Sequence, residues 1–202
     1  MSDAPPRIAL GVSGGIAAYK AAEIVRGLRR GGVDVHVLMT RNARRFITPL
    51  TLETLSGQRV LSDPWRRAAG SDIEHITLAR GLDLMVVAPA TADILAKLAH
   101  GLADDFLSTF HLAVRAPVLV APAMNVGMWE HPATRANLQT LRQRGVTVID
   151  PVAGELACGD EGIGRMAEPE TIVAAVFDRL KKKVRTARGR LRGVPSKAAA
   201  SS

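Results

Sequence analysis

The chain has 202 residues and a formal net charge of +8 at pH 7, and 47% of its residues are hydrophobic although only 3% are aromatic. This length suits one domain with a sizeable core, and the single cysteine excludes an intramolecular disulfide and a multi-cysteine metal site. No apolar run is long enough to span a bilayer, and Met1 to Arg7 contain no signal-peptide core. We therefore expect a soluble cytoplasmic protein without a membrane segment or a bound metal.

The excess positive charge lies at the C-terminal end. Eight of the 27 Lys and Arg, and none of the 19 Asp and Glu, follow Leu180. We therefore divide the chain into a domain of residues 1–180 and a basic tail of residues 181–202, whose Gly, Pro, Ser and Ala content favours disorder. Because the domain is neutral, nucleic-acid binding is not expected as the main function.

Short apolar runs alternate with segments whose apolar residues recur at helical spacing. The runs predict strands at Ile8–Val12, Val35–Met39, Leu84–Ala88, Pro117–Ala121 and Val146–Ile149. The other segments predict helices through Ala17 to Leu28, at Leu50–Leu55, just after His75, at Ala92–Ala99, at Asp105–Val114, at Pro132–Arg144 and from Pro169. The alternation predicts an α/β fold: a doubly wound, Rossmann- or flavodoxin-like parallel sheet of five to six strands with helices on both faces.

A glycine-rich turn follows the first strand, where Ser13, Gly14 and Gly15 precede Ile16. Glycines let the backbone approach a ligand closely, and free N–H groups at the start of a helix favour an anion. The spacing fits neither the dinucleotide fingerprint nor the P-loop. We interpret the turn as a general phosphate cradle, with a tight turn that simply needs glycine as the alternative.

Two further loops follow the second and third strands. Thr40, Arg41 and Asn42 stand near the point where an NAD fingerprint has an acidic residue, which favours a mononucleotide phosphate over an adenosine ribose. The small residues of 88–93 would let a flat ring lie against the backbone. For each loop alone, an ordinary loop or helix cap is an equally good interpretation.

The fourth loop carries Asn125, directly after the strand that ends at Ala121. An isolated Asn in a loop is most often a turn former. All four loops, however, follow strands at the same edge of the sheet, where open α/β sheets bind their ligands. Their convergence predicts a ligand site, and the glycine-rich segment Gly154 to Gly164 around Cys158 has the composition of a mobile flap over it.

These motifs closely resemble those of the homo-oligomeric flavin-containing cysteine decarboxylases, and within that family the bacterial branch that acts on phosphopantothenoylcysteine. The matching segments are residues 11–20, 46–50, 73–77 and 88–93, Pro122 to Asn125 with Met128 and Trp129, and residues 157–166. The resemblance covers about residues 7–178 and does not include the synthetase domain of the fused enzymes.

The resemblance implies FMN-dependent decarboxylation of 4′-phosphopantothenoylcysteine to 4′-phosphopantetheine in coenzyme A biosynthesis. In this family the thiol is oxidised to a thioaldehyde, CO2 leaves, and the resulting enethiol is reduced again. The resemblance assigns His75 as the active-site base, Asn125 as the group that holds the carboxylate, and Cys158 as the proton donor. Ala157 and Met166 would line the substrate side of the flap.

The resemblance also implies cofactor contacts and an assembly. The residues expected to contact FMN are Ser13, Gly14, Gly15, Ile16, Thr40 and Asn42 at the phosphate and ribityl chain, and Thr91, Ala92, Asp93, Ile94 and Ala123 nearer the ring. Family members place the flavin at a subunit interface, so we expect a homotrimer or a larger assembly of trimers such as a dodecamer. A separate phosphopantothenoylcysteine synthetase is a candidate partner.

Four other functions compete with this interpretation. An oxidative peptidyl-cysteine decarboxylase would not need the proton donor Cys158, and a flavin prenyltransferase would lack the Asn125 motif. A non-catalytic flavin-binding regulatory protein would be indicated by loss of His75 or Cys158, and both are present. The glycine spacing and the missing acidic residue disfavour an NAD-dependent dehydrogenase.

Overall fold

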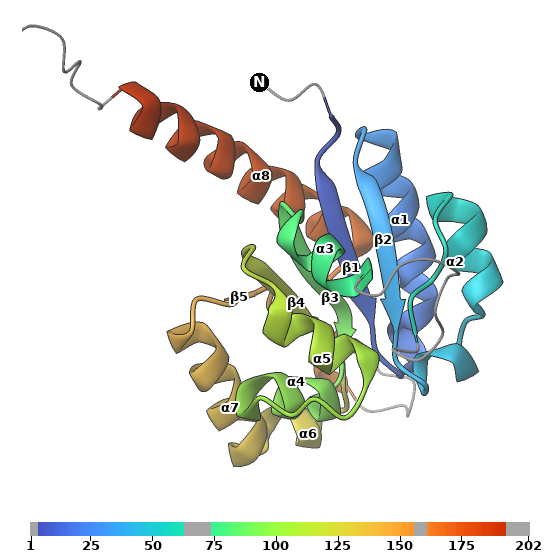
Figure 1. Ribbon diagram of the computed structural model, residues 1–202. Coiled ribbons are helices and arrows are strands. Elements are labelled where there is room, and N and C mark those ends of the chain that lie inside the picture. Colours follow the sequence, from blue (N-terminus) through green and yellow to red (C-terminus); the bar gives the residue numbers. More distant parts are fainter. Residues whose placement is uncertain (1–3, 63–73, 156–160, 193–202) are drawn as a thin grey trace, which may run out of the picture.

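The computed structural model describes residues 4–62, 74–155 and 161–192, without the side chains of residues 74, 75, 155 and 183–192. A central parallel sheet has helices against both faces (Figure 1). Its strands are β1 (Arg7–Val12), β2 (Asp34–Met39), β3 (Leu84–Ala90), β4 (Val118–Pro122) and β5 (Thr147–Val148). The order β2-β1-β3-β4-β5, with every pair parallel, is the flavodoxin-like order and confirms the predicted doubly wound fold with five strands.

Helices connect the strands. They are the 3₁₀ helices η1 (Ile16–Lys20) and η2 (Ala43–Arg45), and α1 (Ala21–Arg30), α2 (Pro49–Ser56), α3 (Glu74–Arg80), α4 (Ala92–His100), α5 (Phe106–Ala113), α6 (Val126–Glu130), α7 (Pro132–Gln143) and α8 (Pro169–Arg192). Local sequence explains several ends: Thr91 caps α4, Asp105 and Ser108 form a capping box at α5, and Gly101 ends α4 in the left-handed conformation. Among the helices described, none combines the length and apolarity needed to cross a membrane.

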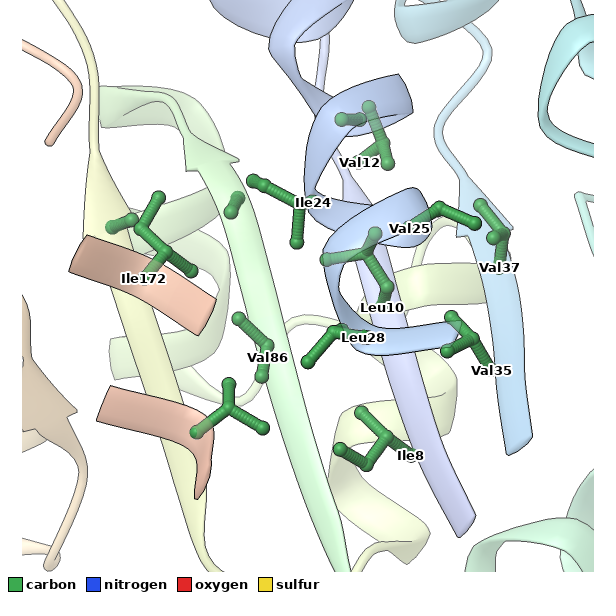
Figure 2. Packing of buried hydrophobic residues seen from close by; sticks show 14 of the residues in the cluster. Ile8, Leu10, Val12, Ile24, Val25, Leu28, Val35, Val37, Val86 and Ile172 are labelled. Carbon is green, nitrogen blue, oxygen red and sulfur yellow. The ribbon is translucent and has the colours of Figure 1, made fainter. Parts of the chain in front are cut away.

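One hydrophobic layer covers the face of the sheet to which α1 and α8 belong. Alternate residues of β1, namely Ile8, Leu10 and Val12, are fully buried and point into this layer. Figure 2 shows them with Ile24 of α1 and Ile172 of α8 in the same cluster. Each such aliphatic side chain contributes about 1.5–3 kcal/mol on burial, so this layer fixes α1 and α8 to the sheet.

The opposite face is covered by a second layer built from α3, α4, α5 and α7. Ala9 and Val87 on the strands pack with buried side chains of these helices, such as Leu98, Phe110 and Leu138. Because both faces are covered, the strands read as continuous apolar runs in sequence rather than as alternating ones. Only the strand ends and the loops that follow them are left to form a site.

The structure adds elements that the sequence did not indicate. Val152–Glu155 (β6) and Glu161–Arg165 (β7) pair as an antiparallel hairpin that overlaps the segment Gly154 to Gly164, which we interpreted as a flap. Gly154 and Gly162 lie opposite each other at φ +148° and +154°. Glycines at these positions hide the alternation by which a strand is recognised. The five residues of α6, after Asn125, are too few for helical periodicity to show.

Two boundaries also differ from those expected. The backbone of His75 lies within α3 rather than before it. Helix α8 runs on to Arg192, past residue 180 where we placed the end of the domain, so the first part of the basic segment is helical. Its Lys and Arg residues are good helix formers, and they outweigh the composition that favours disorder. The division into a domain and a tail stays a prediction.

A polar cluster lies at the amino end of the sheet, on the edge away from the four loops. Asp34 accepts a hydrogen bond from Gln58 Nε2 at 3.1 Å, and its Oδ2 lies 3.0 Å from His36 Nε2 and 3.5 Å from Arg7 Nε. Burial by itself would raise the pKa of Asp34, but His36, Gln58 and Arg7 together hold it below the ordinary value of 3.8. The ionised carboxylate therefore stabilises the fold at neutral pH.

We predict that Asp34→Asn lowers the free energy of unfolding at neutral pH by about 1 kcal/mol, because the neutral amide loses the ion pair with Arg7 and the charge that strengthens the contacts with His36 and Gln58. The folded-state pKa is depressed, so the advantage of the wild type is complete above pH 3.8 and is lost as the pH falls through the lower folded value. Urea unfolding at neutral and at acidic pH measures both effects. Asp178→Asn, at an exposed pair 3.9 Å from Lys181, is the control. A pH-independent difference would contradict the prediction.

Candidate ligand-binding cavity at the carboxyl edge of the sheet

A cavity of about 990 Å³ opens where the loops after β1, β2, β3 and β4 meet. Its volume is at the upper end of the range of about 300–1,000 Å³ that is usual for small-molecule sites. The predicted site residues that line it are Ser13, Gly14, Gly15, Ile16, Thr40, Asn42, Thr91, Ala92, Asp93, Ala123, Asn125 and Met166. The four loops named from the sequence therefore face one common space.

Four predicted site residues do not belong to the described lining of the cavity, one because of its position and three because they or their side chains are not described. Ile94 is fully buried and does not line it, although its backbone N–H donates to Thr91 Oγ1 at 3.4 Å and so helps to shape the third loop. His75 lies on α3, and its side chain is outside the described part of the structure. Ala157 and Cys158 lie outside the described residues. The roles assigned to His75 and Cys158 stay predictions.

The hydroxyl of Ser13 joins the first loop to the third. This side chain is 1% exposed, donates to Pro89 O at 2.7 Å and accepts the backbone N–H of Thr91 at 3.0 Å. Its oxygen also lies 3.2 Å from Thr91 Oγ1. Because a buried hydroxyl that is fully paired is costly to remove, Ser13 holds the loops after β1 and β3 at a fixed separation.

Gly14 lets the first loop touch the second. A Cβ atom at this position would lie 2.7 Å from the carbonyl carbon of Asn42, so any larger residue would push the two loops apart. The backbone N–H groups of Gly14, Gly15 and Ile16 make no hydrogen bond to any residue described. Three adjacent unpaired donors at one wall of a cavity provide a place for an anion.

Asn125 is held in a defined orientation at the fourth loop. It caps α6, and its Oδ1 accepts the N–H of Gly127 at 2.8 Å, so the amide oxygen is turned toward the helix and Nδ2 is the donor end. Trp129 of the same helix is buried, with the Arg135 guanidinium 4.3 Å above its ring. This anchor fixes α6, and therefore the place of the Asn125 amide.

One wall of the cavity carries a charged cluster. Lys97 Nζ lies 3.5 Å from Asp93, 3.1 Å from Asp104 and 3.3 Å from Asp105, and its side chain is only 18% exposed. Burial would lower the pKa of Lys97, but hydrogen bonds to Asp104 and Asp105 and the charge of Asp93 raise it above its ordinary value. Lys97 is therefore cationic and ties α4 to the start of α5.

Several cavity residues were not among those predicted: Tyr19, Lys20, Arg41, Lys97, Asp104, Asp105, Met124, Met128, Gly164 and Arg165. The Asp93–Lys97 pair has the i,i+4 spacing of a helix face, and this spacing could have indicated Lys97. Asp104 and Asp105 are brought to the cavity by tertiary packing, which leaves no local signal. The remaining residues stand in segments that the sequence motifs include, but nothing in those motifs assigned them a contact. Within the described ranges, no group of His, Cys, Asp and Glu is arranged to hold a metal ion.

Comparison with known proteins identifies a family model that matches most of the chain. The family model described as Flavoprotein matches residues 1–181. A curated relative from Vibrio vulnificus (strain YJ016), the coenzyme A biosynthesis bifunctional protein CoaBC, is 49% identical over 168 residues, which make up 83% of this chain. The aligned part is 42% of that relative, so the chain spans less than half of its length.

Solved structures share the fold over most of this chain. A cysteine-to-serine mutant of PPC decarboxylase, complexed with pantothenoylaminoethenethiol, superposes with a TM-score of 0.79 at 35% identity, covering 86% of this chain and 97% of that one. The FMN-dependent cysteine decarboxylase SpaF superposes with a TM-score of 0.74 at 31% identity, covering 87% and 98%. Both similarities extend over nearly the whole of the other chain and more than four fifths of this one.

We predict that Ser13→Ala lowers the free energy of unfolding by about 2 kcal/mol, because Pro89 O and the Thr91 N–H both lose a buried partner. Urea unfolding measures the change. Thr140→Ala is the matched control, since it removes an exposed hydroxyl that bonds Ala136 O at 3.1 Å, and it should change stability by less than about 0.5 kcal/mol. Equal effects of the two substitutions would contradict the role assigned to Ser13.

Proposed function

Because the chain belongs to the Flavoprotein family, we propose that it binds FMN and decarboxylates 4′-phosphopantothenoylcysteine to 4′-phosphopantetheine, a step of coenzyme A biosynthesis. The observation that carries the proposal is the cavity in which the unpaired N–H groups of the glycine-rich loop and the oriented Asn125 amide line the same space. The first provides for a cofactor phosphate and the second for a substrate carboxylate.

The residues present fit FMN. The N–H groups of Gly14, Gly15 and Ile16, with Thr40 and Asn42 beside them, would hold its phosphate and ribityl chain. The flat ring would lie against the part of the cavity wall that is formed by small residues, namely Thr91, Ala92, Asp93 and Ala123. When bound, FMN supplies a reversible two-electron acceptor for the substrate thiol, which protein side chains cannot provide.

Asn125 would bind the substrate carboxylate through Nδ2. Its Oδ1 is committed to Gly127, so the amide does not need to reorient when substrate arrives. A neutral amide suits a leaving carboxylate, since a full positive charge would stabilise the carboxylate itself and oppose the loss of CO2. Oxidation of the neighbouring carbon to a thioaldehyde gives the electrons left behind by CO2 a place to go.

His75 and Cys158 would move the protons. An imidazole has an ordinary pKa near 6.5 and can accept the thiol proton at neutral pH. After CO2 has left as a neutral molecule, the enethiolate needs two electrons and a proton to become the saturated thiol. Cys158 would supply the proton to carbon, and the hydride equivalent would come from the reduced form of the bound cofactor. A chain that lacked this donor would stop at the oxidised enethiol.

The relatives support this substrate above the alternatives. The curated relative at 49% identity is named for coenzyme A biosynthesis, and the structure at 35% identity is a PPC decarboxylase. A peptidyl-cysteine decarboxylase that stops at the enethiol is the second candidate, and the presence of Cys158 opposes it. The 31% identity to the FMN-dependent cysteine decarboxylase SpaF fits both candidates. A flavin-binding protein without turnover is the third.

An assembly is part of the proposal. Three large apolar side chains at the cavity are exposed, Ile16 at 62%, Tyr19 at 56% and Met128 at 48%. Burial of such side chains favours association of identical chains around the cavity, in the homotrimer that we propose. A synthetase partner is proposed because the relatives are bifunctional and this chain matches 42% of the length of one of them.

Anaerobic turnover of phosphopantothenoylcysteine by the FMN-loaded protein tests the function. We expect release of CO2 and the saturated thiol, identified by mass, and at least about a hundredfold loss of saturated product in Cys158→Ser, as is usual for removal of a general acid. The variant should accumulate the oxidised enethiol instead. Release of the enethiol by the wild type would favour the peptidyl-cysteine class, and FMN binding without any turnover would favour the regulatory one.

A further inference from the structure

The β6–β7 hairpin forms part of the cavity wall and is held on one side by the Asn125 loop. Gly164 O accepts the backbone N–H of Met124 at 3.0 Å. A Cβ atom at Gly162 would lie 2.7 Å from Val126 Cγ2, and one at Gly164 would overlap the Met124 carbonyl, so glycine is needed at both positions. These contacts place one edge of the hairpin against the fourth loop.

A second attachment runs through Glu168 to the first loop. The Glu168 carboxylate accepts a hydrogen bond from Lys20 Nζ at 2.7 Å and from Arg165 Nη2 at 3.1 Å. Lys20 ends η1, the helix that follows the glycine-rich turn, and Arg165 ends β7. One carboxylate therefore links the cofactor loop proposed above to the hairpin, across 148 residues of chain.

Glu168 and Arg165 are both held in place by the residues around them. Met166 and Ala167, which precede Glu168, are each 1% exposed and belong to the core, and Glu168 O accepts the Ile172 N–H at 3.1 Å in the first turn of α8. Arg165 lies across the partner strand, since a Cβ atom at Gly154 would be 2.6 Å from its Nη1. A movement of Arg165 would therefore displace both strands.

The positive charges of Lys20 and Arg165 require the Glu168 carboxylate between them. Hydrogen bonding to Lys20 is the largest of the effects that lower the pKa of Glu168, and the charges of Lys20 and Arg165 add to it, so the carboxylate is ionised at neutral pH. Without it, two cations would face each other. Isolated surface ion pairs contribute little, but this one is shared by three groups, and the Lys20 side chain is only 13% exposed.

We propose that Glu168 is a positioning residue, which holds the β6–β7 hairpin at a fixed place relative to the glycine-rich loop through Arg165 and Lys20. The hairpin carries Arg165 and leads into Met166, two lining residues of the cavity, and the chain between its strands contains Cys158. Its effect on turnover rests on the proposed function, whereas its effect on the hairpin does not.

Two readouts test the proposal in Glu168→Gln. Cys158 is the only cysteine, so its rate of alkylation by iodoacetamide reports on the hairpin, and we expect that rate to change at least threefold, an effect of about 0.65 kcal/mol. In the FMN-loaded protein, kcat with phosphopantothenoylcysteine should fall roughly tenfold while KM and FMN content change less than about twofold. Lys20→Met breaks the same link from the other end and should give the same change in alkylation.

Glu170→Gln is the matched control, because Glu170 is exposed, lies two residues further along and does not line the cavity. Glu168→Asp keeps the charge and should recover part of the wild-type alkylation rate and kcat. Identical alkylation in Glu168→Gln, Lys20→Met and Glu170→Gln would overturn the proposal. If Glu168→Gln and Lys20→Met change the alkylation rate as expected but the wild type does not turn over the substrate, the proposed function is refuted and the positioning role stands.

Discussion

The buried hydroxyl of Ser13 holds two loops together between β1 and β3, where the order in which the chain adds strands to the sheet reverses. From β1 the chain proceeds to β2 on one side, and from β3 it proceeds to β4 on the other, so the connections that follow β1 and β3 cover opposite faces and leave a crevice between them. The bonds from Ser13 to Pro89 and Thr91 set the width of that crevice. The Gly14 contact with Asn42 then adds the loop after β2, and the remaining site is built on this frame.

The rest of the cavity is held together by ion pairs between side chains of different elements. Lys97 draws together the carboxylates of α4 and of the turn before α5, while Glu168 joins Lys20 to Arg165 on another wall. These three cations are held by carboxylates, whereas the backbone N–H groups of Gly14, Gly15 and Ile16 make no hydrogen bond to a described residue and provide a place for a cofactor phosphate. Asn125, neutral and oriented by Gly127, completes the arrangement.

Much of this arrangement could be predicted from local sequence. The apolar runs at Ile8–Val12 and Leu84–Ala88 indicated buried parallel strands, and loops that follow such strands must share an edge. The hairpin was missed because Gly154 and Gly162 interrupt its alternation. The Lys20–Glu168 pair could not be seen, since partners separated by 148 residues leave no periodic signal and meet only when α8 packs on the sheet. Asn125 was found from its position after a strand.

The central claim is that the glycine-rich loop holds the phosphate of FMN. Fluorescence titration of the flavin-free protein with FMN and with riboflavin, in the wild type and in Gly14→Ala, tests it most directly. We expect FMN to bind at least about tenfold more tightly than riboflavin. The added methyl group should remove most of this preference, because it forces the loop away from Asn42. Equal affinities for the two flavins, or an unchanged preference in Gly14→Ala, would contradict it.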